Sequence, residues 1–375
     1  MKPTFTRIAT RLDKITPHIT GMITLLCTAA LLTISTSWGA DCPIPQEGDL
    51  VLRDFQFKSG EVLPQLKLHD RTIGAPVRDQ AGTVRNAVLL VHGTTGSGRF
   101  FLGPRFCEVL YGPGQPLDAS RYFIILPDNI GHGASSKPSD GLHVRFPHYN
   151  YDDMVVAHFR LLTEQLGVSH LRLVMGTSMG GSLTWLWGTK YPAFMDALVP
   201  VASLPVEIAG ENRIARRVII DAVRNDPTWQ NGGYTTAPPG LVPALQMFFF
   251  MLNSRAQLQK QAPTAVATDQ MLDKWVQVVR TQTDANDFLY QWEAMRDYNP
   301  EPDLEKIQAR VVAINFADDQ FNPAELGIFE STMKRIKRGE GVLVPASDKT
   351  RGHLTLTLPA LWQEHLANVM ADSTP

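Results

Sequence analysis

The sequence predicts a doubly wound α/β fold, in which a mostly parallel sheet carries helices on both faces and a helical insertion interrupts the alternation. Three observations lead to this fold class. Apolar runs of strand length recur along the chain, segments with helical spacing separate them, and one interval of about a hundred residues contains no convincing strand. A chain of 375 residues is long enough to bury such a core.

Six apolar runs rich in Val, Ile and Leu have the length of strands. Their hydrophobicity is nearly continuous, which is typical of strands buried on both faces of a parallel sheet. The runs occupy residues 86–92, 121–128, 171–176, 196–203, 309–316 and 341–347. Before the first run, residues 51–74 predict a hairpin that turns at Ser59-Gly60.

Helical segments lie between these runs. Residues 151–167 have an acidic first turn, apolar residues three and four positions apart, and Gly167 as a stop. The segment that follows Ser178 is helical and ends before Pro192, and residues 358–370 predict a closing helix that begins with a proline.

The interval 205–302 breaks the alternation. It contains helical stretches separated by loops, so we expect a helical lid there, between two parts of a core at 41–204 and 303–375. A lid over the carboxyl ends of the strands would cover any site at that edge. Its aromatic residues either line an apolar pocket or form the lid's own core, namely Phe248 to Phe250, Trp275 and Trp292.

Residues 1–40 differ from the rest of the chain. Basic residues up to Lys14 precede an uncharged apolar run at 21–34, and small residues follow, which is typical of a secretory signal peptide. We expect cleavage between about Ser37 and Asp41, a periplasmic or secreted protein, and no stable membrane insertion afterwards. The alternative is an uncleaved anchor, although the apolar run is short for a membrane span.

Composition limits the partners. The formal net charge is −2 and no long basic block occurs, which argues against nucleic acid and against an anionic membrane surface. No metal-binding or phosphate-binding motif is found, so we expect neither a metal nor a cofactor.

Cys42 and Cys107 would remain after signal removal, either as one disulfide or as two buried thiols. The sequence is compatible with either a monomer or a homodimer.

Ser178 is the strongest candidate for chemistry. It lies in Gly176-Thr177-Ser178-Met179-Gly180-Gly181, a G-x-S-x-G pattern that follows a strand and begins a helix. The glycines permit a tight turn that exposes the hydroxyl at the positive end of the helix. The pattern therefore predicts a nucleophile, and the alternative is an ordinary helix N-cap serine.

A serine nucleophile needs a base, and the base needs an orienting acid. His353 follows the last apolar run and a glycine, which predicts that it is the base. Asp318 and Asp319 both end the strand that follows the insertion. We prefer Asp319 as the acid, which leaves Asp318 as a solvated loop carboxylate or a cap.

Backbone N–H groups should bind the oxyanion. One belongs to Met179, directly after the nucleophile, and the other to Thr94 or Thr95 in the glycine-containing loop 92–98. His92 is expected to form structural hydrogen bonds rather than take part in catalysis.

These motifs resemble the α/β-hydrolase superfamily and, within it, the homoserine O-acetyltransferase group. The resemblance implies an α/β-hydrolase fold with Ser178 as nucleophile, Asp319 as acid and His353 as base. The D-x-x-x-P spacing of that group favours Asp319. The segments that carry the resemblance are 59–74, 87–98, 176–192, 225–234 and 318–323, together with Gly352-His353.

The departures from that group concern the acyl acceptor. Its members place an arginine about six residues before the Asp-Pro of the lid, where it binds an amino acid's carboxylate. Here that position is Ile220, and Arg216 and Arg217 are expected to lie in a different helical phase, so we expect no charge-assisted contact. After the elbow, Ser182-Leu183 also departs from the group's Met-Gln pair.

Together, the motifs and departures predict an exported serine esterase that cleaves a small-molecule carboxylic ester or lactone through an acyl-enzyme on Ser178, without a cofactor. Two alternatives remain: an O-acyltransferase of the homoserine O-acetyltransferase type, and a non-catalytic binding protein on a hydrolase scaffold.

Overall fold

An eight-stranded sheet forms the centre of the molecule, with the strand order β1-β2-β4-β3-β5-β6-β7-β8. The computed structural model describes residues 42–372, so the predicted signal peptide and its cleavage zone lie outside the described residues. The strands are β1 (Gln46–Gln56), β2 (Val62–Ile73), β3 (Ala87–Val91), β4 (Phe123–Pro127), β5 (Leu171–Thr177), β6 (Met195–Val201), β7 (Arg310–Phe316) and β8 (Gly339–Val344). The six predicted runs and the hairpin are confirmed.

The sheet is parallel from β4 to β8 and antiparallel at one edge. β1 pairs with β2, and β2 pairs with β4, in antiparallel register. The hairpin turns at the predicted Ser59-Gly60, where Gly60 has a φ of 88° that disfavours other residues. The remaining neighbours pair in parallel, as the helical crossovers between them require.

Hydrophobic layers cover both faces of the sheet, which explains why the strand runs are apolar without alternation. In β3, Leu89 and Val91 face a core that includes α2 and α3, whereas Val88 and Leu90 face a second core that includes α1 and α10. The helices outside the lid are α1 (Pro104–Leu110), α2 (Tyr151–Arg160), α3 (Met179–Lys190), α9 (Ile328–Met333) and α10 (Gln363–Asp372). The doubly wound fold class is therefore confirmed.

Two predicted helices differ in detail. The segment 151–167 is an α-helix only to Arg160 and continues as a π-helical turn, Leu161–Gln165, before Gly167 ends it with a φ of 64°. The closing helix does not begin with a proline. Pro359 starts a 3-10 turn, and α10 begins at Gln363, since a proline favours the first turn but the chain bends at Trp362.

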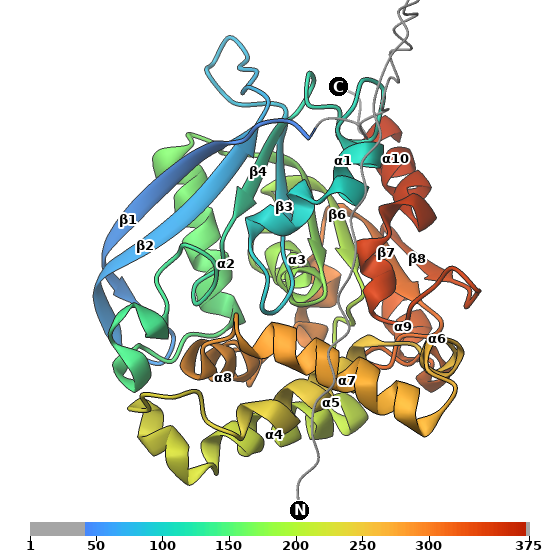
Figure 1. Cartoon of the computed structure of the whole chain (residues 1–375). Coiled ribbons are helices and arrows are strands. Elements are labelled where there is room, and N and C mark those ends of the chain that lie inside the picture. The colour runs from blue at the N-terminus through green and yellow to red at the C-terminus, as the bar shows by residue number, and fades with distance from the viewer. Residues whose placement is uncertain (1–41, 373–375) are drawn as a thin grey trace, which may run out of the picture. The chain divides into compact units, whose positions relative to one another are not determined.

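The chain between β6 and β7 forms a helical lid, without a strand among the described residues. Figure 1 shows its helices gathered at one end of the sheet. They are α4 (Gly210–Arg224), α5 (Leu241–Leu252), α6 (Arg255–Gln261), α7 (Ala265–Arg280) and α8 (Ala285–Glu293). The aromatic residues of the lid pack mainly against one another, and Trp292, for example, stands 5.1 Å from Phe248 between ring centres. Phe248, Trp275 and Trp292 belong to the core of the lid, whereas Phe250 is exposed.

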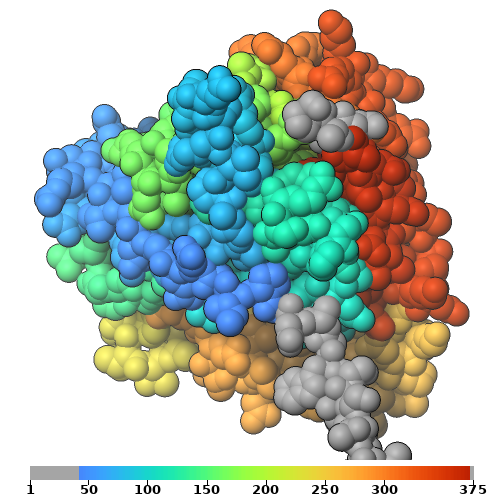
Figure 2. Space-filling model, turned by 90° about the horizontal axis from the view of Figure 1, so that it is seen from above, coloured from blue at the N-terminus to red at the C-terminus, as the bar shows by residue number. Residues whose placement is uncertain are grey.

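The two cysteines that follow residue 41 are joined. Cys42 and Cys107 form a disulfide with a Cα–Cα distance of 5.0 Å, which fastens the start of the described chain to α1. On the same side, α1 lies beside α10 (Figure 2), where the rings of Phe106 and Trp362 are 6.4 Å apart. Within residues 42–372 no helix is both long enough and apolar enough to cross a membrane.

Candidate active site

The turn between β5 and α3 holds Ser178 in an unusual backbone conformation. Its φ is 56° and its ψ is −118°, values that a non-glycine residue adopts only under constraint. The neighbouring glycines make the turn possible. A Cβ at Gly180 would overlap the carbonyl oxygen of Val91, and a Cβ at Gly176 would overlap the carbonyl of Gly180. The turn therefore projects the Ser178 hydroxyl from the carboxyl end of the sheet.

The structure brings Ser178, His353 and Asp319 into one hydrogen-bonded chain. Ser178 Oγ lies 2.8 Å from His353 Nε2, and His353 Nδ1 lies 2.8 Å from Asp319 Oδ2. The Asp319 and His353 side chains are almost fully buried, whereas Ser178 is partly exposed. This arrangement orients the imidazole with one nitrogen toward the acid and the other toward the hydroxyl.

Asn322 supports the acid, and the sequence reasoning missed it. Its side-chain amide donates to Asp319 Oδ2 at 2.8 Å and to the carbonyl of Ala202 at 3.0 Å. The backbone N–H of Phe321 donates to the other oxygen, Asp319 Oδ1, at 2.8 Å. Together with His353 Nδ1, these two groups give the carboxylate three hydrogen-bond partners. The available signal in the sequence was an asparagine three residues after the acid.

Asp318 is neither a solvated carboxylate nor a cap, so that expectation is wrong. Its Oδ2 accepts hydrogen bonds from the N–H of Gly352 and the hydroxyl of Thr350, each at 3.0 Å. The two neighbouring aspartates thus bind the same loop at different points: Asp319 contacts the His353 ring, and Asp318 holds the backbone before it.

The loop after β3 passes directly beside Ser178. A Cβ at Gly93 would lie 3.2 Å from the Cβ of Ser178, which is closer than an ordinary van der Waals contact. Gly93 and Gly96 close a turn with a 3.1 Å hydrogen bond, and Thr95 within it has a φ of 64° and an exposed side chain. The Thr94 N–H has no hydrogen-bond partner among the described residues. Met179 begins α3, so its N–H has no partner within the helix.

Buried histidines form part of the wall behind this loop. His92 Nδ1 lies 2.8 Å from the carbonyl oxygen of Gly93, and His92 Nε2 accepts the N–H of Asn129 at 3.0 Å. His132 lies beside it, with ring centres 5.1 Å apart. Burial lowers the pKa of His92 to about 4 and that of His132 to about 3, which keeps both rings neutral. These contacts agree with the structural role expected for His92.

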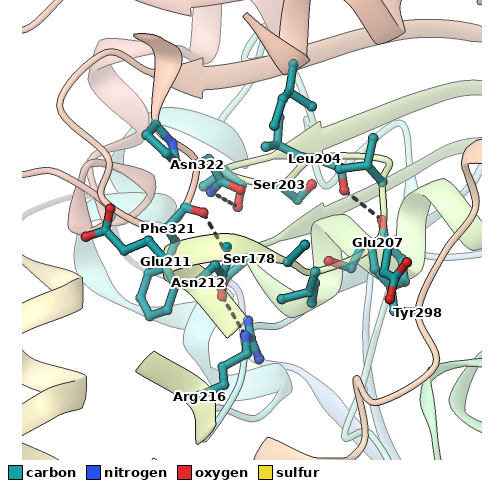
Figure 3. Close-up of a pocket in the computed structure, with 18 of the residues that line it drawn as sticks. Ser178, Ser203, Leu204, Glu207, Glu211, Asn212, Arg216, Tyr298, Phe321 and Asn322 are labelled. Carbon is teal, nitrogen blue, oxygen red and sulfur yellow. Dashed lines mark hydrogen bonds between the residues drawn. The ribbon is translucent and has the colours of Figure 1, made fainter. Parts of the chain in front are cut away.

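A cavity of about 170 Å³ opens beside Ser178. Its walls come from the elbow, from the end of β6 with the segment that leads into the lid, from α4, and from the loops that carry Asp319 and His353 (Figure 3). Ser182, which departs from the group's pattern, lies in this wall. Its apolar lining includes Leu204, Val206, Ile208, Leu326, Ile328 and Phe321. Phe248 to Phe250 and Trp275 do not line it.

Arg216 also lines this cavity, contrary to the expectation of an uncharged wall. Positions 216 and 220 are one helical turn apart and therefore share a face of α4. Ile220 packs into the hydrophobic core, and Arg216, one turn earlier, reaches the cavity. The predicted difference in helical phase was wrong, because a spacing of four residues preserves the face.

The Arg216 guanidinium is 93% buried and incompletely partnered. Its Nε donates to Asn212 Oδ1 at 2.7 Å, and the group stacks over the ring of Trp292 at 5.0 Å. Asn212 lies between Ser178 and Arg216 in Figure 3. Among residues 42–372, Arg216 Nη1 has no hydrogen-bond partner and the group has no ion pair. Burial lowers the pKa of Arg216.

No cluster of three or more His, Cys, Asp or Glu side chains within the described residues could hold a metal ion. The chemistry that this site offers is nucleophilic. It presents an activated hydroxyl, a base with an oriented acid, two free backbone N–H groups, and a small cavity with one buried cation.

Comparison with known proteins identifies the fold family. A family described as alpha/beta hydrolase fold matches residues 86–324. The chain is 27% identical to a probable acyltransferase of Methanothermobacter thermautotrophicus over 304 residues, which is 81% of this chain and 91% of that protein. It is 33% identical to the homoserine O-acetyltransferase of Geotalea daltonii over 205 residues, 49% of this chain and about half (53%) of that enzyme.

The fold is also found in solved structures. The acetyl esterase MekB superposes with a TM-score of 0.75, at 22% sequence identity, over 87% of this chain and 97% of that one. Proteins named as an esterase and proteins named as acyltransferases therefore both resemble this chain.

Proposed function

Because the chain belongs to the α/β-hydrolase fold family, we propose that it is a serine hydrolase that cleaves a small-molecule carboxylic ester or lactone through an acyl-enzyme on Ser178. The observation that carries the proposal is the hydrogen-bonded chain from Ser178 through His353 to Asp319. Each member has the neighbour that its role requires.

The acylation step follows from this geometry. Ser178 Oγ attacks the ester carbonyl while His353 Nε2, 2.8 Å away, takes the hydroxyl proton. The negative charge that develops on the carbonyl oxygen is stabilised by the N–H groups of Met179 and Thr94. Of the two threonines in that loop, Thr94 follows Gly93, the residue in closest approach to Ser178, and has a free N–H. His353 then protonates the leaving alcohol.

Deacylation repeats the sequence with water as the nucleophile. His353 takes a proton from water, hydroxide attacks the acyl carbonyl, and Ser178 leaves with the proton returned by His353. Asp319 holds His353 Nδ1–H throughout and stabilises the imidazolium. The carboxylate stays in place because Asn322 and the N–H of Phe321 donate to it.

The proposed setting is the periplasm or the extracellular space. The order of basic, apolar and small residues in the first forty positions supports export. The Cys42–Cys107 disulfide supports it as well, since such bonds persist in oxidising compartments. Acetyl-CoA is a cytoplasmic acyl donor, so an exported enzyme would lack the donor for acetyl transfer. Export therefore favours ester hydrolysis, in which water is the acyl acceptor.

One observation favours a second candidate, acyl transfer to an acceptor that carries a carboxylate. Arg216 lines the cavity that also holds Ser178, and its buried Nη1 has no hydrogen-bond partner among the described residues. A buried guanidinium is stabilised by an anion, and a carboxylate matches its planar donors. The acetyltransferase relatives act on homoserine by name, and an amino acid has such a group.

The decisive experiment follows the fate of the acyl group. Purified protein is incubated with an activated acetyl ester, with and without homoserine or serine, and free acetate and O-acetyl product are quantified. We expect acetate at an equal rate in all mixtures. O-acetyl amino acid formed in preference to acetate would replace the hydrolase by the transferase.

A fluorophosphonate probe tests whether the site is catalytic at all. We expect rapid labelling of the intact protein and none of Ser178→Ala, which removes the nucleophile but little volume. Equal labelling of both proteins, or of neither, would favour the third alternative, a binding protein on a hydrolase scaffold.

Arg216→Met separates the two substrate classes. The substitution keeps an unbranched, flexible side chain and removes the charged guanidinium. If the substrate carries a carboxylate near the reacting ester, KM rises about 10- to 100-fold, because a charge-assisted contact contributes about 1.5–3 kcal/mol, while a neutral acetyl ester is unaffected. An equal effect on acidic and neutral esters would assign Arg216 a structural role only.

A further inference from the structure

The loop that begins with Asp319 is attached to the lid by each of the two residues that follow it. The carbonyl of Phe321 accepts a hydrogen bond from Asn212 of α4 at 2.9 Å. Gln320 contacts the other end of the lid, at the junction of α5 and α6. Residues 250–257 of this junction are called the lid corner below.

Gln320 makes every one of its side-chain hydrogen bonds to the lid corner. Its Nε2 donates to the carbonyl of Phe250 at 2.9 Å and to that of Asn253 at 2.7 Å, and its Oε1 accepts from Arg255 Nε at 3.3 Å. The Phe250 carbonyl is at the C-terminal end of α5, where helices leave carbonyls without an internal partner. The Gln320 amide therefore caps this helix, and it is 94% buried.

The same lid corner touches the loop that carries His353. Gln257 of α6, also more than nine-tenths buried, donates from Nε2 to the carbonyl of Asp348 at 3.0 Å. Nearer to the histidine, Gly352 packs against the backbone of the lid, since a Cβ at that position would lie 2.6 Å from the N of Ser254. The residue before His353 thus has Asp318 on one side and the lid corner on the other.

These contacts have an energetic consequence. A buried amide that loses its partner carries the full cost of desolvation, so Gln320 and Gln257 resist any separation of the lid corner from the two loops. Gln320 adjoins Asp319, and the separation of Asp319 Oδ2 and His353 Nδ1 is 2.8 Å. A displacement of about 1 Å in such a geometry costs on the order of 100-fold in rate.

We propose that Gln320 and Gln257 are positioning residues for the reaction, which clamp the lid corner onto the loops of Asp319 and His353 and so hold the acid and the base in register. The proposal rests on the proposed function of Asp319 and His353 as the catalytic acid and base. In this proposal the lid covers the cavity and also helps to align the catalytic residues.

Two isosteric variants test the clamp. Gln320→Met and Gln257→Met keep the volume and remove the donors. We expect kcat on a short neutral ester to fall about 10- to 100-fold in Gln320→Met and by a smaller factor in Gln257→Met, while KM stays within about twofold. The rate of fluorophosphonate labelling of Ser178 should fall in parallel with kcat, because it depends on the same base.

Tyr234→Phe is the matched control. The Tyr234 hydroxyl donates to Asp284 at 2.6 Å and accepts from the N–H of Ala285 at 2.9 Å, within the lid and without a contact to either loop. We expect this variant to lose stability with kcat and the labelling rate unchanged. A wild-type kcat and labelling rate in both Met variants would overturn the clamp, as would an equal loss of kcat in Tyr234→Phe.

Hydrogen exchange gives a readout that does not require turnover. The amides of residues 345–357 should exchange faster in both Met variants than in the wild type and in Tyr234→Phe. Unchanged protection would overturn the clamp even if activity falls. If the wild-type protein neither hydrolyses esters nor reacts with the probe, the proposed function fails, and the exchange result still decides whether the lid corner holds these loops.

Discussion

Asp318 and Asp319 show how neighbouring residues of one type acquire different tasks. Both follow β7, but successive side chains at a strand end point in different directions. Asp319 meets the His353 ring, whereas Asp318 meets the backbone of Gly352 and the hydroxyl of Thr350. In the proposed reaction, the imidazole gains and loses a proton beside Asp319, whereas the contacts of Asp318 do not change.

Asparagine substitutions distinguish the two aspartates. Asp319→Asn should lower kcat on the order of 10⁴-fold, because a neutral amide neither stabilises the imidazolium nor enforces the reactive tautomer. In Asp318→Asn the amide oxygen still accepts from Gly352, so we expect a loss below about tenfold. Steady-state kinetics on one ester measures both. A larger loss for Asp318→Asn would reverse the assignment of the acid.

The elbow between β5 and α3 is the element that the sequence encodes most locally. Its two glycines are required by close backbone approach, and neither is replaceable by the smallest side chain. The strand before it and the helix after it are both buried, so the turn cannot relax outward. The strain at Ser178 is thus balanced by packing on both sides.

Gly180→Ala tests the elbow. Its new methyl group would overlap the Val91 carbonyl, and we expect the free energy of unfolding to fall by about 3–4 kcal/mol, with loss of probe labelling at Ser178. Gly233→Ala is the control, since its φ is −92° and the nearest atom to an added Cβ is 3.4 Å away. Denaturant unfolding curves give both values. A stability loss in Gly180→Ala no larger than in the control would refute the close contact.

The lid contributes to the site through α4 and through the junction of α5 and α6. α4 places Arg216 in the cavity, and the α5–α6 junction binds the loops of Asp319 and His353. Phe248, Trp275 and Trp292 pack against one another in the interior of the lid, and none of them lines the cavity.

On the scale of the whole molecule, buried ionisable groups make stability depend on pH. Burial holds the pKa of His92 at about 4 and those of His132 and His158 at about 3, below the ordinary 6.5. Between these values the unfolded chain binds more protons, so their contribution is complete above pH 6.5 and is lost on acidification. Asp70 and Asp287 oppose this, because burial raises their pKa to about 6 and the folded state binds their protons from about pH 4 to 6.

His158→Met should therefore flatten the acid dependence of stability. His158 is buried in α2 and neither ring nitrogen has a hydrogen-bond partner among the described residues. Its removal should reduce the slope of the unfolding free energy between pH 4 and 6 by up to about 1.4 kcal/mol per pH unit. The exposed His143→Asn should leave the slope unchanged. An identical slope in His158→Met and the wild type would contradict a neutral buried His158.

The disulfide acts on the same scale, through the unfolded chain. Cys42 and Cys107 are 65 residues apart, and a closed loop of this length stabilises the fold by about 4 kcal/mol. We expect the double variant Cys42→Ser, Cys107→Ser to lose about this much in guanidinium unfolding. Addition of a thiol reductant should reduce the stability of the wild type alone. Equal sensitivity of the double variant to the reductant would mean that another effect is measured.

The sequence by itself determined the doubly wound sheet, the helical insertion and the elbow serine, because each depends on residues adjacent in the chain. Continuous apolar runs report burial on both faces of the sheet, and the glycines around Ser178 report a turn that no other residue permits. It also predicted Asp319 and His353, because in this fold the acid and the histidine follow the nucleophile along the chain. The structure places both within hydrogen-bonding reach.

Only the tertiary structure decided what surrounds them. Asp318 on the His353 loop, Arg216 in the cavity and Gln320 on the lid corner depend on contacts across long separations in sequence. Asn322 is only three residues from Asp319, but its side chain also donates to the distant Ala202 carbonyl. Arg216 shares a helix face with Ile220, but a lone helix does not show which part of that face lies at the cavity. These contacts are decided by how the lid packs on the sheet, and that packing sums many small interactions that no single motif contains.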